Sequence, residues 1–327
     1  MNGESNQYGT KAISIVDPLS RAMTWSRDVL FRPFDLMKWI VLGFCAWLAM
    51  LCDGGGYQGS GNWNGPQRRD HQSIEDGLYE AWEWVLVHWV AIVTIASIVI
   101  FVLVAIWLLC LWLSSRGKFM FLDGVVHNRA AVAAPWREFR GPANALFGFR
   151  IIVGLIGTAI VICFLAFVAL LVLLGVRTPD LGPPLVAVGI FGLLAFVAIM
   201  IGFAFVGLAM NDFVVPLMYL GDRGVGAAWR ELGGLVSARP GVFVLYVLIK
   251  IVIAFAVAAI SVLACCLTCC IAALPYIGTV ILLPIWVFAR AFPLYFLGQF
   301  GPQYARFVTL GPLPEMEAQL PSNPSET

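Results

Sequence analysis

Apolar residues occur along the chain in six runs that are separated by polar segments. The runs are continuous rather than alternating, which predicts helices and not β-strands. A bilayer core about 30 Å thick is crossed by about 20 apolar residues of helix. The pattern therefore predicts an all-α integral membrane protein with about six transmembrane helices, arranged as three hairpins. The runs cover about 36–52, 84–114, 147–176 and 185–210, a fifth starts near 242, and a sixth follows a break at Pro275 and Gly278.

The composition agrees with this pattern. Of the 327 residues, 61% are hydrophobic and 12% are charged, and the mean hydropathy is +0.89. A soluble domain has about 25% charged residues, and a chain this apolar could not cover a water-facing surface. The net charge is only +1, so bulk charge indicates no nucleic-acid partner. The lipid bilayer is the partner that the composition implies.

Lysine and arginine are concentrated in alternate connections between the runs. The opposite connections contain only Arg68, Arg69 and Arg177, and the segment 53–83 is rich in acidic residues. By the positive-inside rule, the basic connections lie in the cytoplasm. Both termini are then cytoplasmic, and residues 53–83 form an outer loop.

The basic connections share a motif. AVAAPWREF (131–139) and GVGAAWREL (224–232) each place WRE after small residues, and SRAMTWSRDVL (20–30) is a more diverged copy. A large apolar residue follows each Trp by three or four positions, so the two lie on one helical face. This pattern predicts amphipathic helices in the membrane interface, where Trp is favoured. The predicted anchors are Trp25, Trp136, Arg137, Trp229 and Arg230.

Three further segments also match one another: KFMFLDG (118–124), PLMYLGD (216–222) and PLYFLGQ (293–299). Together the matches predict a pseudo-threefold repeat, in which each unit is an interfacial helix followed by a transmembrane hairpin. We expect one transmembrane domain between a flexible N-terminus and a disordered, acidic, proline-containing tail. The boundaries are 1–16 for the N-terminus, 17–304 for the domain, with units at about 17–114, 118–210 and 216–300, and 305–327 for the tail.

The segments SRGKFMFLDGVV, NDFVVPLMYL and CLTCCIAALPYIGTVILLP resemble a family of uncharacterised six-span bacterial membrane proteins, known as a domain of unknown function. The family is distantly similar to the membrane domain attached to some glycerophosphodiester phosphodiesterases. The resemblance covers roughly 17–304 and implies a multipass protein of the bacterial cytoplasmic (inner) membrane. Its motifs carry no assigned chemistry, and no soluble phosphodiesterase domain is visible in the sequence. Phosphodiesterase activity is therefore not implied.

Ionisable residues inside apolar runs are the first candidates for a functional site. Asn211 and Asp212 end the fourth run at a depth comparable with those of Lys250 and Arg290. We therefore consider an intramembrane polar cluster of these four residues, in which Asp212 pairs with Arg290 or Lys250. Two alternatives stay open. The Lys250 stem can extend to the interface, and the repeat alignment pairs Arg290 with Arg116, at the cytoplasmic end of its span.

Half of the cysteines lie in CCLTCC (265–270), which raises the question of metal, disulfide or packing. The length of the fifth run puts this segment near the outer end of its hairpin. On a helix its four thiols lie on two adjacent faces and cannot enclose one tetrahedral ion unless the helix unwinds or outside ligands take part. Packing is favoured over a disulfide, and a disulfide over a metal. The candidates are Cys52, Cys265, Cys266, Cys269 and Cys270, and we expect no metal and no cofactor.

No serine elbow, HExxH motif or other catalytic constellation occurs in the sequence, so we expect no enzyme. Two interpretations remain. The scarce internal charge and the interfacial helices favour a non-enzymatic multispan protein that organises the membrane or an assembly within it. The repeats, Pro284 inside the sixth run and the polar cluster favour a transporter or permease for a lipid-like or small apolar solute. A second copy of the chain or another membrane protein stays open as a partner.

Overall fold

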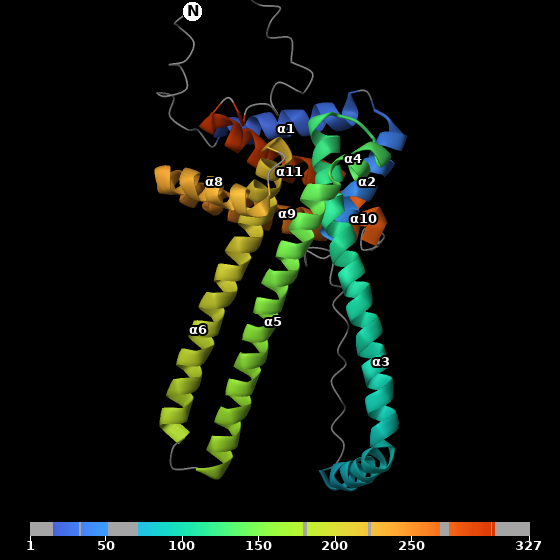
Figure 1. Cartoon of the computed structure of the whole chain (residues 1–327), viewed down its shortest axis with the longest axis vertical. Helices are drawn as coiled ribbons and strands as arrows, with labels where there is room; N and C mark the ends of the chain where they lie inside the picture. Colours follow the sequence, from blue (N-terminus) through green and yellow to red (C-terminus); the bar gives the residue numbers. More distant parts are fainter. Residues whose placement is uncertain are drawn as a thin grey trace, which may run out of the picture.

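The protein is described by a computed structural model that covers residues 16–32, 34–51, 71–178, 182–221, 224–268, 275–301 and 303–304, with α3 side chains from Val87 onward. Within these ranges every element is helical (Figure 1). The helices are α1 (Val16–Phe31), α2 (Leu36–Met50), α3 (His71–Val126), α4 (Ala133–Glu138), α5 (Arg140–Arg177), α6 (Gly182–Ala209), α7 (Val215–Gly221), α8 (Val225–Ala238), α9 (Pro240–Leu267), α10 (Pro275–Ile281) and α11 (Leu283–Leu297). A π-helix, η2 (Met210–Val214), joins α6 to α7, and the 3-10 turn η4 (Gly298–Phe300) follows α11.

Four of these helices are long and apolar enough to cross a membrane. Their candidate spans are Val87–Val126, Arg140–Arg177, Gly182–Gly221 and Pro240–Leu267. The shortest has 28 residues, which extend about 42 Å at about 1.5 Å per residue. That length exceeds a hydrocarbon core of about 30 Å. The predicted membrane character therefore has a structural basis in α3, α5, α6 and α9.

The other two predicted spans are shorter or interrupted. The first run forms α2, which has 15 residues and extends about 22 Å. The sixth run divides at Leu282 into α10 and α11, two residues before Pro284. Proline has no backbone N–H to continue a helical ladder, so a break at this point is expected. Six spans and the threefold repeat are not confirmed by the described residues and stay predictions.

Most buried side chains lie in one region, which we call the head. It consists of α1, α2, α4, α7, α8, α10 and α11 with the adjoining ends of α3, α5 and α9. Its largest fully buried side chains include Phe119, Phe292, Phe296, Leu42 and Leu48. Figure 1 shows α3, α5 and α6 leaving the head in the same general direction.

The long helices are covered by exposed apolar side chains once they leave the head. Phe101, Phe191 and Phe255 are each more than 70% exposed, although phenylalanine is normally buried in soluble proteins. The α5–α6 hairpin is joined by the stacked rings of Phe164 and Phe196, 4.0 Å apart at their centroids. Apolar surface of this extent is compatible with surroundings of lipid, which has no hydrogen bonds to lose.

Close contacts fix the arrangement of the head. Ser114 Oγ on α3 donates to the carbonyl oxygen of Ala49, at the end of α2 (2.9 Å). Ser26 Oγ on α1 donates to the Pro284 carbonyl oxygen on α11 (2.8 Å). Gly117 allows α3 to approach α2, because an added Cβ would lie 2.6 Å from the Ala49 backbone nitrogen.

The predicted interfacial helices correspond to α1, α4 and α8, all in the head. Trp25 Nε1 donates to the Val125 carbonyl oxygen (3.1 Å), and the Trp229 ring packs against Phe149. Arg137 and Arg230 are exposed. The helix around Trp136 is shorter than the motif suggests, because α4 ends at Glu138 and Phe139 forms the turn before α5.

Candidate functional site

A group of buried and half-buried polar side chains lies where α3, η2, α9 and α11 meet. We call it the Asp212 cluster; its members are Lys118, Asn211, Asp212, Tyr246, Lys250 and Arg290. Lys250 Nζ lies 2.8 Å from Asp212 Oδ2, and Tyr246 Oη donates to the same oxygen at 2.8 Å. Lys118 Nζ donates to Asn211 Oδ1. The cluster thus joins the four elements through charged and polar side chains.

The π-helix supplies an acceptor for Arg290. In η2 the Val215 N–H donates to the Met210 carbonyl oxygen, five residues back. The corresponding donor for the Asn211 carbonyl would be residue 216, which is a proline and has no N–H. Arg290 Nη1 donates to this carbonyl oxygen at 2.7 Å instead. A π-turn before a proline therefore leaves a backbone acceptor for a side chain of α11, and π-turns are frequent at functional sites.

Aromatic rings pack around Tyr246 in the Asp212 cluster. Tyr246 is fully buried, and its ring stacks on Phe292 with centroids 5.2 Å apart. Phe213 packs on Tyr246 at 4.9 Å. Asp212 and Lys118 are 7% and 2% exposed, so both are shielded from solvent. In such surroundings an ion pair is strong, but leaving either charge without its partner is costly.

The structure brings together all four residues of the predicted polar cluster. It pairs Asp212 with Lys250, while Arg290 contacts the Asn211 backbone and donates through Nη2 to the Lys118 carbonyl oxygen (3.3 Å). Sequence reasoning missed Lys118 and Tyr246. Tyr246 lies four residues before Lys250 on α9, a spacing that puts both on one helical face. That spacing is a signal that could have identified it.

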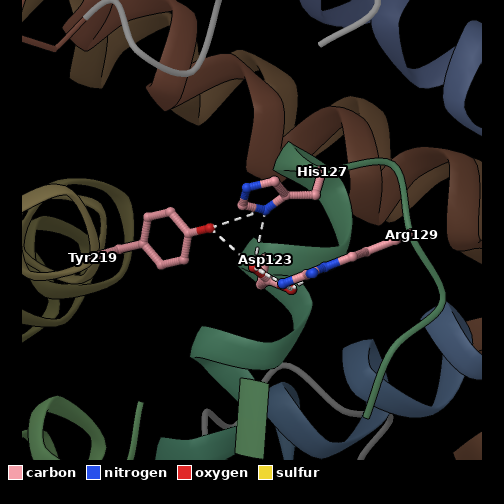
Figure 2. A network of polar contacts seen from close by, with 4 residues as sticks. All are labelled: Asp123, His127, Arg129 and Tyr219. Atoms are coloured by element: carbon pink, nitrogen blue, oxygen red, sulfur yellow. Dashed lines mark hydrogen bonds and ion pairs between the residues drawn. The ribbon is translucent and has the colours of Figure 1, made fainter. Parts of the chain in front are cut away.

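A second group, the Asp123 cluster, contains Asp123, His127, Arg129 and Tyr219 (Figure 2). Arg129 donates to the Asp123 carboxylate from Nε (3.0 Å) and Nη2 (3.1 Å). His127 Nδ1 lies 2.9 Å from Asp123 Oδ1. Tyr219 Oη, on α7, donates to the same Oδ1 at 3.0 Å and lies 3.2 Å from His127 Nδ1. One buried carboxylate therefore joins the end of α3 to α7.

Local chain geometry builds the Asp123 cluster. Asp123 and His127 are four residues apart and so share a helical face. Asn128 has a φ of 52°, a left-handed conformation that asparagine tolerates. This residue reverses the chain after α3, and Arg129 then folds back onto Asp123. Lys38 Nζ donates to both the Asn128 side-chain oxygen and the Val29 carbonyl oxygen, which holds the reversal against α1 and α2. Asp123 and Tyr219 lie in the repeated segments KFMFLDG and PLMYLGD, but the sequence does not indicate that they meet each other or His127 and Arg129.

The two described cysteine candidates lie at the C-terminal end of α9, 15 and 16 residues after Lys250. Cys265 and Cys266 are in the last turn of α9, and Cys266 is exposed and not in a disulfide. Cys52, Cys269 and Cys270 lie outside the described residues. Among the residues that the structure describes, no three His, Cys, Asp or Glu side chains converge as a metal site would require.

Comparison with known proteins gives a family but no activity. The sequence profile described as a family of unknown function, DUF7544, matches residues 13–285. The matched region extends from α1 into α11 and contains every member of both clusters except Arg290. No curated protein and no solved structure matches the chain.

Proposed function

We propose that this chain, which belongs to the DUF7544 family of proteins of unknown function, is a non-enzymatic multispan protein of the bacterial inner membrane that organises the membrane or an assembly within it. The observation that carries this proposal is a separation of charge. The four long helices contain no Asp, Glu, Lys or Arg over 87–113, 151–176, 182–211 and 251–267. The ionisable side chains of the Asp212 cluster are instead gathered in the head, where Asp212 is held by Lys250 and Tyr246.

This separation favours a scaffold over a pathway for polar solutes. A transport route through a bilayer is usually marked by ionisable groups inside the spans. In this chain Lys118, Asp212 and Lys250 lie inside three of the candidate spans, but nearer to the ends that join the head. Their interactions are with other parts of the protein, so their evident effect is to hold α3, η2, α9 and α11 together.

The distribution of basic residues gives the orientation. Arg137, Arg140 and Arg230 are exposed on the head, whereas Arg177 is at the far end of α5. By the positive-inside rule the head faces the cytoplasm. Helices α1 and α11 both belong to the head, which agrees with an even number of crossings and with both termini in the cytoplasm.

The six-span, three-hairpin arrangement is part of the proposal. Tyr276 Oη donates to the Ile40 carbonyl oxygen (3.0 Å), so α10 packs beside α2, which itself packs on α3. The three matching segments each contribute one buried residue at the same repeat position, Phe119, Leu217 and Leu294, to a common apolar core. Shared burial at an equivalent position is what an internal repeat would produce.

A permease for a lipid-like or small apolar solute is the second candidate. It is favoured by the uncovered apolar surfaces of the long helices: in three of the four, the most apolar stretch has no buried residue. Such surfaces could guide an acyl chain past the Asp212 cluster. Water access along α5 in the membrane would support this candidate over the scaffold.

Alkaline carbonate extraction and cysteine labelling test the main proposal. The labelled protein is a variant with all eight cysteines replaced by alanine and with Arg177→Cys or, as the matched control, Arg230→Cys. We expect the protein to stay in the carbonate-washed membrane pellet. In intact spheroplasts, an impermeant maleimide should label R177C at once and R230C only after permeabilisation. Release by carbonate would overturn the membrane assignment, and the opposite labelling pattern would overturn the orientation.

A further inference from the structure

Arg116 lies at the end of the apolar part of α3, between two tryptophan rings. Its Cζ is 4.5 Å from the Trp112 ring centroid and 4.7 Å from that of Trp136. The two rings meet edge to face, 5.7 Å apart. Tryptophan is enriched at the depth of lipid headgroups. Cation–π contacts therefore hold this guanidinium at interfacial depth, without supplying a negative charge.

The charge of Arg116 is not neutralised by a described carboxylate. Its Nη1 donates to the Trp136 carbonyl oxygen (3.3 Å) and its Nη2 to Asn144 Oδ1 (3.4 Å), and both acceptors are neutral. The side chain is only 6% exposed, and its Nε is buried without a hydrogen-bond partner. The exposed Arg140 is near enough for its positive charge to act on Arg116. Among the described residues neither arginine forms an ion pair.

The first turn of α5 adds hydrogen-bond donors at the same place. The two acceptors of Arg116 flank the start of this helix, since Trp136 precedes it and Asn144 is in its first turns. The N-cap residue, Phe139, provides no side-chain cap. The first amides of a helix have no acceptor within the helix, and its N-terminus is attractive to anions. Here these amides belong to Arg140 and Gly141, because Pro142 has no N–H.

We propose that Arg116, Arg140, Asn144 and the first turn of α5 bind the phosphate of an anionic lipid headgroup. Arginine binds phosphate through charge-assisted hydrogen bonds, and basic pockets between membrane helices bind anionic lipids on the cytoplasmic side. The tryptophans and the apolar part of α3 next to the site provide a surface for the acyl chains of the same lipid. This inference rests on the proposed function, because it requires the head to lie at the cytoplasmic interface.

The test is native mass spectrometry of the purified full chain in detergent, titrated with phosphatidylglycerol or with zwitterionic phosphatidylcholine. We expect the wild-type protein to retain phosphatidylglycerol preferentially. Arg140→Gln should weaken this retention about tenfold, which is the effect of about 1.4 kcal/mol in binding free energy. Arg230→Gln, which removes an exposed arginine from the equivalent motif on α8, is the matched control and should retain the lipid as the wild type does.

Two further arms separate the alternatives. Arg116→Gln should abolish the preference for phosphatidylglycerol. If this substitution of a buried residue prevents folding, the result for Arg140→Gln still decides the test. Inorganic phosphate and soluble glycerol phosphate are each added as competitors of phosphatidylglycerol. If the two displace the lipid equally well, and Arg140→Gln weakens the binding of both competitors to the same extent, the site binds a free anion and the lipid assignment fails. Unchanged lipid retention in Arg140→Gln overturns the site itself. The proposed function is tested separately by carbonate extraction of the same variants, which should all stay in the membrane.

Discussion

At the scale of single residues, Asp212 is a buried carboxylate whose charge depends on its partners. It is 7% exposed and accepts from both Lys250 and Tyr246. Removing one partner of a buried ion pair destabilises a protein far more than replacing both partners with apolar residues. The Asp212 cluster therefore depends on the presence of both members of its ion pair.

Replacing Lys250 by methionine should destabilise the protein by about 3 kcal/mol, the lower end of the range for breaking a buried pair, because the Lys250 side chain is 20% exposed. The measurement is unfolding of the purified protein in mixed micelles with increasing dodecyl sulfate. Arg239→Gln, at an exposed site between α8 and α9, is the control.

Adding Asp212→Asn to Lys250→Met should recover much of that loss, because no charge is then stranded in the head. A double variant that is no more stable than the single Lys250→Met variant would show that the two residues are not energetically coupled. The coupling free energy from the complete cycle decides between these outcomes.

The Tyr219 hydroxyl gives a prediction for the stability of the Asp123 cluster. Tyr219→Phe removes the hydroxyl that Asp123 accepts from, and it should lower the unfolding free energy by about 1–2 kcal/mol. Tyr295→Phe is the matched control, because the Tyr295 hydroxyl has no hydrogen-bond partner among the described residues. Equal stability of the two variants would mean that the link from α7 to Asp123 contributes nothing.

At the residue scale, depth along an apolar run is the informative signal in the sequence. Asn211 and Asp212 end a run, while Lys250 and Arg290 interrupt two others, and the structure places the four side by side. A functional role for them stays a prediction. Lys118 was seen only as part of a repeated segment. Arg129 reaches Asp123 through a chain reversal at Asn128, and one backbone dihedral of this kind has no periodic signature. Tyr219 reaches Asp123 from α7 by packing, which the sequence does not show.

At the scale of elements, Pro216 illustrates how a helix can pass a proline. The sequence marks Pro216 as an interruption of an apolar run, and a proline ring clashes with the carbonyl four residues earlier. Helix α6 continues into α7 through the π-helix η2, which lies directly before the proline. The wider turn accommodates the ring and presents the Asn211 carbonyl to Arg290.

The contact between α2 and α3 gives a prediction at this scale. At Gly117 an added Cβ would lie 2.6 Å from the Ala49 nitrogen and 2.7 Å from the Leu48 carbonyl carbon, and backbone atoms cannot move aside as a side chain could. Gly117→Ala should therefore separate the two helices and lower the yield of folded protein several-fold. Gly148→Ala on α5, where an added Cβ meets nothing within 4 Å, should be neutral or stabilising by about 0.5–1 kcal/mol.

The readout for this pair is monodispersity in size-exclusion chromatography after membrane extraction. If Gly117→Ala eluted like Gly148→Ala, the close approach of α2 and α3 would be unimportant for folding. This contact was not predictable from the sequence, because many glycines in the chain lie in helices and only the packing partner distinguishes Gly117 from Gly148.

At the scale of the whole molecule, the head buries its apolar side chains, whereas the long helices expose theirs. The native Cys163 tests this contrast, because it is exposed on α5 yet lies far from both ends of that helix. In sealed membranes it should resist a water-soluble maleimide, since thiol reactivity requires the thiolate and a bilayer disfavours charge. Cys266, exposed near the end of α9, should react much faster.

Peptide mass spectrometry before and after denaturation measures both rates in the unmodified chain. Comparable labelling of Cys163 and Cys266 in intact membranes would mean that water reaches the centre of α5, and it would favour the permease over the scaffold. Full protection of Cys163, with labelling restored by denaturant, is the expected result.

The overall class was readable from hydrophobic runs because a bilayer sets their length. The four longest runs correspond to α3, α5, α6 and α9. The short first run and the proline-divided sixth run became α2 and the α10–α11 pair, whose arrangement depends on packing in the head. Length and hydropathy carry no information on such packing, so the number of crossings was less predictable than the helical class.

The hydrogen bond from Ser26 to Pro284 spans 258 positions of the chain. At about 5–20 residues per second, a ribosome needs about 13–52 s to synthesise the segment between them. Throughout that interval the face of α1 that receives α11 has no partner, while the intervening helices are already emerging. Completion of the head by α11 is therefore one of the last events in biosynthesis, and until α11 docks this face of α1 is open to membrane proteases.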